Sequence, residues 1–175
     1  MLTTALLLGS CPDPASRGEE RAGNHFAAPQ GIAAHSRWVL VTNTAYHLDE
    51  AGTQAFGPGF VTIIDRQTRQ VAATVPTTQR NPQRVAVVGD LAYVLNAGVV
   101  KLGKGGPATV VEGGGIDVLH LAGATPPRKV LRNIALPRSS ADERIGAYGS
   151  IAVDPDGKTA FIGSGTRGDV FVVNL

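Results

Sequence analysis

The chain has 175 residues, which suits one domain with a buried core and is short for two. The net charge is +2 and the charges are mixed along the chain, so a nucleic-acid groove is not expected. No apolar stretch reaches the roughly 18 residues of a membrane helix, which excludes a polytopic membrane protein. Glycine (22) and proline (11) are abundant and aromatics make up only 5%. This composition favours many short strands joined by turns.

An uncharged apolar segment at the N-terminus ends in two small residues and the single cysteine, Cys11. This pattern is typical of an export signal. Leu8-Gly9-Ser10-Cys11 resembles the lipobox of bacterial lipoproteins, which implies cleavage before Cys11 and acylation of its thiol. One feature departs from the pattern of an export signal: no Lys or Arg precedes the apolar run. A misplaced start codon or a truncated N-terminus would explain this departure. The alternative interpretation is an ordinary strand with a chance cysteine.

The expected organisation has three parts: a signal peptide at residues 1–10, an acylated linker at 11–28 and a folded domain at 29–175. Residues 12–28 are rich in Pro, Gly, Ser and charge and lack periodicity, which is linker composition. No second cysteine would remain in the mature chain for a disulfide.

A sequence repeat runs through the folded part. Residues 29–34 and 38–43 align with 82–87 and 92–96, and again with 149–153 and 160–164. Further apolar runs follow in each unit, at 60–65, 70–75, 116–121, 129–136 and 170–175. Each run has five to eight residues, is rich in β-branched side chains and is bounded by turn residues, which indicates strands.

We therefore predict an all-β fold made of β-propeller blades, each a four-stranded antiparallel meander. Two full blades and most of a third are expected, at about residues 29–78, 79–137 and 144–175, with eleven strands in all. Because a closed propeller needs about four to eight blades, these are expected to be part of a larger ring. The alternative fold is a β-sandwich, which does not require the repeat.

The second strand of each unit carries a family resemblance. Leu40-Val41-Thr42-Asn43, Tyr93-Val94-Leu95-Asn96 and, more weakly, Phe161-Ile162-Gly163-Ser164 resemble the YVTN type of β-propeller repeat. The final Asn is replaced by Ser164 in the third unit. The resemblance implies an exported, seven-bladed bacterial protein, and it says little about function because members of this family are varied.

The lengths of the links predict which end of the blades carries function. In a four-stranded meander, the links between strands 2 and 3 and between blades lie at one end, and the long links 44–58, 76–81, 97–114 and 137–148 are all of this kind. Long loops on a rigid scaffold are where binding residues tend to lie. The alternative is that insertions there are simply tolerated.

Polar residues cluster where the first strands begin. Arg80, Gln83 and Arg84 enter the first strand of the second unit, so Arg84 is expected near the mouth of a central channel, with Gln30 and Ser150 at matching positions. Such residues suit an anionic or carbohydrate ligand. The alternative is that they bond neighbouring blades. Apolar first-strand residues deeper in are expected to pack, namely Ile32, Ala34, Val85, Val87, Ile151 and Val153.

His47, Asp49 and Glu50 are weak candidates for ligating a divalent metal, because a His with two carboxylates can do so. The alternative is a solvated loop. The chain shows no recognisable nucleophile motif and no phosphate-binding glycine loop, so we expect no cofactor.

Two functions follow as hypotheses. The preferred one is a non-catalytic binding or scaffold lipoprotein of the bacterial envelope, anchored to a membrane by lipid and facing the periplasm or the exterior. Its long-loop face would bind a protein, glycan or small molecule, and not nucleic acid. The alternative is a metal-dependent, lactonase-like hydrolase whose remaining ligands lie in further blades.

Overall fold

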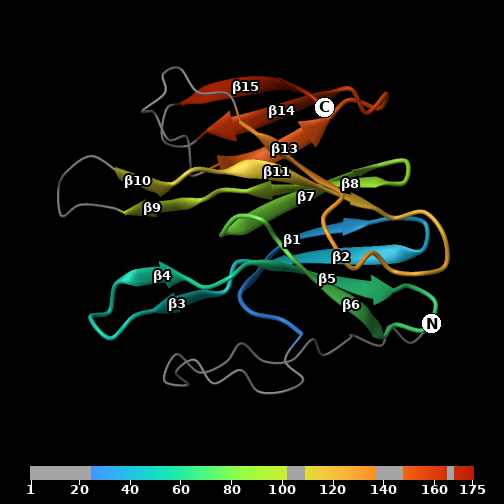
Figure 1. Ribbon diagram of the computed structural model, residues 1–175, viewed down its shortest axis with the longest axis horizontal. Helices are drawn as coiled ribbons and strands as arrows, with labels where there is room; N and C mark the ends of the chain where they lie inside the picture. Colours follow the sequence, from blue (N-terminus) through green and yellow to red (C-terminus); the bar gives the residue numbers. More distant parts are fainter. Residues whose placement is uncertain (1–24, 102–108, 137–147, 165–167) are drawn as a thin grey trace, which may run out of the picture.

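The computed structural model describes residues 25–101, 109–136, 148–164 and 168–175. The expected signal segment, Cys11 and most of the linker lie outside the described residues, as do parts of the long links. Every element of the described part is a β-strand (Figure 1). Within it, no helix is long and apolar enough to span a membrane.

The first blade is an antiparallel sheet of four strands in the order β1-β2-β5-β6. Its strands are β1 (Pro29–Ala34), β2 (Trp38–Asn43), β5 (Phe60–Asp65) and β6 (Val71–Pro76). Leu40 and Ile63 are cross-strand partners on one face of this sheet, and that face packs against the second blade.

The second blade repeats this order with β7 (Pro82–Val88), β8 (Leu91–Asn96), β11 (Gly115–His120) and β12 (Arg132–Ala135). The third has β13 (Tyr148–Val153), β14 (Thr159–Ser164) and β15 (Asp169–Asn174). All neighbouring strands are antiparallel. The predicted fold class, two full propeller blades and most of a third, is therefore confirmed.

The blades are stacked face to face, with two apolar cores between them (Figure 1). β1 contacts β7, and β7 contacts β13, so the first strand of each blade lies on one side of the stack, where a propeller has its axis. One core joins the first and second blades and is closed by Trp38, whose indole N–H donates to the Leu121 carbonyl oxygen over 3.1 Å. The other joins the second and third blades around Tyr93 and Ile162.

Two hairpins were not expected from the sequence. β3 (Tyr46–Leu48) pairs with β4 (Gln54–Phe56), and β9 (Val99–Lys101) pairs with β10 (Thr109–Glu112). The described residues thus hold fifteen strands rather than eleven. The links were interpreted as loops because strands of three or four residues are too short for a periodic pattern to show.

Two of the expected packing residues are not buried. Ile32 is 67% exposed and Ala34 is also exposed, because they lie on the face of the first blade that has no neighbouring blade. The equivalent residues in the other blades do pack against an interblade core, as predicted: Val85, Val87, Ile151 and Val153.

Candidate binding face

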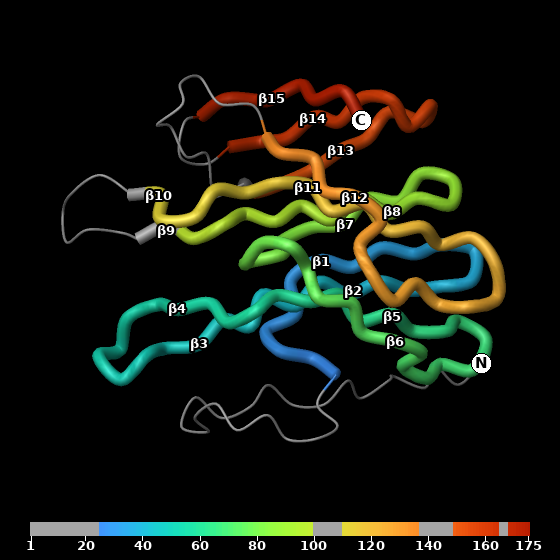
Figure 2. Tube along the Cα trace, viewed as in Figure 1, coloured from blue at the N-terminus to red at the C-terminus, as the bar shows by residue number. Residues whose placement is uncertain are grey.

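Both hairpins lie at the end of the blades that holds the long links. Each is inserted between the second and third strands of its blade, β3–β4 after β2 and β9–β10 after β8. They extend in the same direction beyond the sheets, at the left of the view, whereas the opposite end holds the short β1–β2 and β7–β8 turns and the longer link from β11 to β12 (Figure 2). We call the end with the hairpins the hairpin face and the other end the turn face.

The β3–β4 hairpin exposes an aromatic and aliphatic surface. Tyr46 is 41% exposed and Leu48 is 53% exposed. The Tyr46 ring lies against Phe56, with 5.7 Å between the ring centroids, which holds the two strands together. Asp49 shapes the tip, because its carboxylate accepts the backbone N–H groups of Ala51 and Thr53.

The β9–β10 hairpin is tied to the segment that precedes β7. The Glu112 carboxylate accepts the backbone N–H of Arg80 at 3.0 Å and lies 3.4 Å from the Arg80 Nε. Over half of the Arg80 side chain is exposed beside this ion pair. Arg80, a predicted binding residue, is therefore on the hairpin face and already has an anionic partner.

Arg84 bonds the neighbouring blade. Its guanidinium donates to the carbonyl oxygen of Gln83 at 2.9 Å and to that of Gln30, in the first blade, at 3.4 Å. This is the interblade bonding that was the alternative to ligand binding at this position. Both bonds come from one guanidinium nitrogen, and the residue is half-buried. The positive charge of Arg84 therefore lies where β7 and β1 meet.

The predicted matching of Gln30 with Arg84 is wrong by one position. Pro29 pairs with Asn43 and Pro82 pairs with Asn96, so Gln30 is equivalent to Gln83. The residue equivalent to Arg84 in the first blade is Gly31. β1 and β7 each have a bulge after the proline, at the same place, so counting along the chain from Pro29 and from Pro82 gives this match directly.

The remaining predicted mouth residues differ in their surroundings. Ser150 is exposed on β13 at the position equivalent to Arg84, as expected. Gln83 donates its amide to Asn81 Oδ1 over 2.8 Å, and Asn81 in turn donates to the Gly98 carbonyl oxygen. The two amides thus connect β7 with the base of the β9–β10 hairpin. Amides, hydroxyl and guanidinium groups on one surface offer donors suited to an anion or a carbohydrate.

Sequence reasoning missed the buried polar groups below this surface. Asp117 is fully buried, and its carboxylate accepts hydrogen bonds from Thr78, Asn96 and Asn133. In the first blade, Asn43 donates to Thr62 in the same geometry. The Asn that ends each of these two second strands therefore ties the second strand to the third. The sequence does show that Asn43 and Asn96 recur at the same place in the repeat, and this recurrence could have indicated that they join the second strand to the third.

The weak metal candidates His47, Asp49 and Glu50 do not converge. The Asp49 carboxylate is engaged at the hairpin tip and a His47 ring nitrogen lies 3.2 Å from the Ala45 carbonyl oxygen. Among the residues that the structure describes, no group of three or more His, Cys, Asp or Glu side chains could hold a metal ion. The described part therefore offers no ready metal site.

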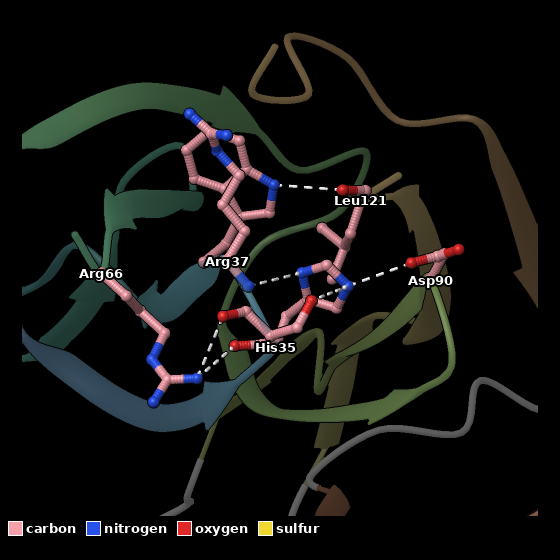
Figure 3. A network of polar contacts seen from close by, with 7 residues as sticks. His35, Arg37, Arg66, Asp90 and Leu121 are labelled. Atoms are coloured by element: carbon pink, nitrogen blue, oxygen red, sulfur yellow. Dashed lines mark hydrogen bonds and ion pairs between the residues drawn. The ribbon is translucent and has the colours of Figure 1, made fainter. Parts of the chain in front are cut away.

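The turn face carries a polar network around His35 (Figure 3). His35 Nε2 lies 3.1 Å from an oxygen of Asp90 and 3.3 Å from Ser36 Oγ, while Nδ1 accepts the backbone N–H of Arg37. Because Nδ1 is an acceptor, the neutral ring carries its proton on Nε2 and donates it to Asp90. The ring cannot then act as a base for Ser36, so this trio is not a catalytic triad.

Around this network two arginines line an open hollow with Ser36 and Gln67. Arg66 donates to the carbonyl oxygens of His35 and Ser36, and Arg37 pairs with Asp65 at 3.2 Å while stacking on the Trp38 ring. The Asp65 carboxylate also accepts the backbone N–H groups of Thr68 and Gln67. The Thr68 bond, then the Gln67 bond and Arg37, lower the pKa of Asp65 against an opposing effect of burial.

With this geometry described, known structures were compared. The chain is similar to the periplasmic gluconolactonase of Pseudomonas aeruginosa, with 19% identity and a TM-score of 0.54, over 83% of this chain and 39% of that one. The fold is a β-propeller. The Dos1 propeller (14% identity, TM-score 0.36, 83% of this chain and 41% of that one) and hydrazine synthase of Kuenenia stuttgartiensis (12%, 0.38, 83% and 64%) also match.

The propeller chain thus spans about two fifths of the length of the gluconolactonase. No protein-family model matches it, and no curated protein matches it either. At this level of identity the similarity establishes the propeller fold and not the activity.

Proposed function

We propose that this propeller is a non-catalytic binding or scaffold module that takes its partner on the hairpin face. The observation that carries the proposal is the pair of hairpins, inserted at equivalent points of two blades and projecting from the same end. The exposed Tyr46 and Leu48 supply apolar contact area, and Arg80 and Gln83 supply hydrogen-bond donors at the same end of the blades. A surface of this mixed composition suits a protein or a glycan partner.

Photo-crosslinking tests the choice of face. A photoreactive amino acid replaces Leu48 on the hairpin face or, as the matched control, Gln67 on the turn face; both residues are exposed. We expect a discrete cross-linked partner from position 48 and none from position 67. Cross-linking from position 67 alone would overturn the assignment of the face.

We further propose that the protein is a lipoprotein of a bacterial envelope, of the YVTN propeller type, held by Cys11 through the linker at 11–28. Support comes from the lipobox-like Leu8-Gly9-Ser10-Cys11 and the linker composition. Two or three acyl chains on this residue would bury enough methylenes for stable anchoring. Labelling with a radioactive fatty acid should mark the wild type and not Cys11→Ser, and equal labelling of both would contradict the anchor.

The alternative is a metal-dependent, lactonase-like hydrolase. The similarity to a gluconolactonase motivates it, and the described residues provide no group of metal ligands for it. Hydrolysis of glucono-δ-lactone by the purified protein, followed with and without Ca²⁺ or Zn²⁺, separates the two hypotheses. A rate above the spontaneous one that disappears with a chelator would favour the hydrolase over the binding module.

A further inference from the structure

The turn face of the first two blades gathers positive charge that is dispersed along the sequence. The links at this end, together with the first residue of β12, hold six cations and two carboxylates. The cations, which we call the basic surface, are Arg37, Arg66, Arg69, Arg128, Lys129 and Arg132. The carboxylates are Asp65, at the end of β5, and Asp90. This end of the two blades is therefore strongly positive.

Most of this charge is available to a partner. All six cations are exposed residues. Arg37 pairs with the buried Asp65, and among the described residues no carboxylate forms an ion pair with the other five cations. Asp90, whose side chain is 61% exposed, lies against His35. The two carboxylates thus offset only a small part of the basic surface.

The cations of the two blades belong to one continuous surface. The Trp38 indole N–H donates to the Leu121 carbonyl oxygen and His35 contacts Asp90, so the β1–β2 turn lies against both links of the second blade. Val130, which follows Lys129, packs against the core that contains Trp38. In Figure 1 the orange link from β11 to β12 accordingly lies beside the blue β1–β2 turn, at the right of the view.

An apolar side chain lies among these cations. Leu131 is 58% exposed, whereas its neighbour Val130 is partly buried against the core. The Leu131 N–H donates to the Val118 carbonyl oxygen, which fixes the backbone beside β11. An exposed leucine between Lys129 and Arg132 suits the boundary between lipid headgroups and acyl chains. The phosphates of a nucleic acid would offer this side chain no apolar contact.

The tip of the β3–β4 hairpin, at the other end of the blades, has the opposite charge. Asp49 and Glu50 are exposed there, and residues 44–58 include no Lys or Arg. A negatively charged surface would therefore attract the turn face and repel this tip. The difference in charge between the two ends can orient the whole molecule.

We propose that the basic surface docks on a membrane surface of anionic phospholipids, which turns the hairpin face away from the membrane. Charge complementarity carries the choice of partner, since each Lys or Arg that reaches such headgroups raises the affinity about fivefold. The choice of a lipid surface rests on the proposed anchoring through Cys11, whereas the docking itself needs no acyl chain. The basic surface would act as a second attachment beside the lipid anchor.

Vesicle flotation of the whole chain carrying Cys11→Ser, which cannot be acylated there, tests the docking. We expect binding to vesicles of phosphatidylglycerol and phosphatidylcholine, none to phosphatidylcholine alone, and weaker binding as salt is added. Arg66→Gln combined with Arg69→Gln should weaken binding about fivefold for each charge. Lys158→Gln is the matched control, at an exposed cation of the third blade outside the basic surface, and should change binding less than about twofold.

A second variant separates lipid from other polyanions. Leu131→Ser keeps every charge and should weaken vesicle binding several-fold without changing the circular dichroism. Absence of flotation at low salt, equal losses with Lys158→Gln, or tighter binding to a DNA duplex than to the anionic vesicles would each overturn the proposal. Fatty-acid labelling of Cys11 is independent of these results, so the anchor and the docking surface can fail separately.

Quenching tests the orientation without removing a charge. A fluorescent label is attached to Gln67→Cys on the turn face or to Leu48→Cys on the hairpin face, both in the Cys11→Ser background. The vesicles carry a quencher on their headgroups. We expect strong quenching of the label at position 67 and little at position 48, and any other pattern would reject the orientation.

Discussion

Gly31 lies where two blades come closest together. A Cβ atom at this position would stand 2.8 Å from the Gln83 carbonyl oxygen and 2.9 Å from Arg84 Cα, both on the neighbouring β7. The Thr42 hydroxyl also accepts the Gly31 N–H at 2.8 Å, so the backbone cannot shift freely to make room. The residue is required for space and not for an unusual backbone angle.

Gly31→Ala should therefore destabilise the protein by about 1–3 kcal/mol through overpacking against backbone atoms. Urea unfolding followed by circular dichroism measures the change. Gly149→Ala is the matched control, since Gly149 also lies on a first strand and a Cβ atom there would meet nothing within 4 Å. If both variants lost the same free energy of unfolding, the close approach of β7 would not be the reason for a glycine at position 31.

Asp65 links stability to pH. Its pKa is lowered in the folded state, chiefly by the Thr68 N–H and further by the Gln67 N–H and Arg37. A lowered carboxyl pKa contributes stability above the pKa of the unfolded chain, and this contribution is lost as the pH falls through the folded-state pKa. The wild type should thus exceed Asp65→Asn in free energy of unfolding at neutral pH, and the difference should shrink in acid.

Unfolding of both chains across a series of pH values from neutral to about 2 gives that difference directly. Glu50→Gln, at an exposed carboxylate on the hairpin tip, serves as the comparison. A constant gap between wild type and Asp65→Asn at all pH values would show that the carboxylate charge is not responsible.

The sequence predicted the position of a residue correctly where that position depends only on the strand to which the residue belongs. Arg80 and Ser150 lie on the expected end because strand direction alone places them there. The pairing of Arg84 with the Gln30 carbonyl oxygen and the network of Asp117 depend on contacts between segments far apart in the chain. No spacing within the sequence reveals such contacts.

At the scale of elements, the two hairpins are held differently. β3–β4 relies on its own Tyr46–Phe56 contact and the Asp49 turn. β9–β10 is joined to the rest of the second blade by Glu112, which binds both the backbone and the side chain of Arg80. Bonds from Asn81 and Arg80 to residues 97 and 98 hold the base of this hairpin, and the Glu112 carboxylate ties β10 to the same segment.

Glu112→Ala should loosen this hairpin without unfolding the blades. We expect faster amide exchange in β9 and β10, with a melting temperature unchanged to within a few degrees, because the ion pair is partly exposed. Hydrogen exchange read by mass spectrometry makes the measurement. Glu112→Gln retains an acceptor for the Arg80 N–H and should lie between the variant and the wild type, and unaltered exchange in Glu112→Ala would refute the link.

The long strands of the blades were predictable and the short ones were not. Runs such as 60–65 and 92–96 have β-branched or aromatic residues, turn residues at both ends and a repeat partner elsewhere in the chain. Strands β3, β4, β9 and β10 have three or four residues, and each becomes regular only by pairing with its partner. A strand could therefore be predicted from the sequence when it was long enough to show a pattern and had a counterpart in the repeat.

For the molecule as a whole, the second blade is shared by both apolar cores. Val94 and Leu119 face the first blade, whereas Tyr93 and Val118 face the third. Loss of the second blade would expose both cores at once, so the three blades should unfold together. Trp38, the single tryptophan, is 1% exposed at the first of these interfaces and reports on it.

Tryptophan fluorescence and far-ultraviolet circular dichroism should therefore give coincident urea transitions. The first signal reports the junction between the first two blades and the second reports all strands. Ala160→Gly, a cavity-forming change in the other core, should move both transitions equally. If the fluorescence transition stays in place while the dichroism shifts, the third blade unfolds independently.

Every long strand pairs only within its own blade, and this has a consequence for the order of folding during synthesis. All the partners of β1 and β2 have been made once residue 76 exists, so the first sheet can pair long before the chain is complete. Its apolar side remains open until the second blade arrives, because the Trp38 N–H waits for the carbonyl of Leu121. A ribosome-bound chain should thus show a tryptophan in water until about that residue has emerged, and a shielded one afterwards.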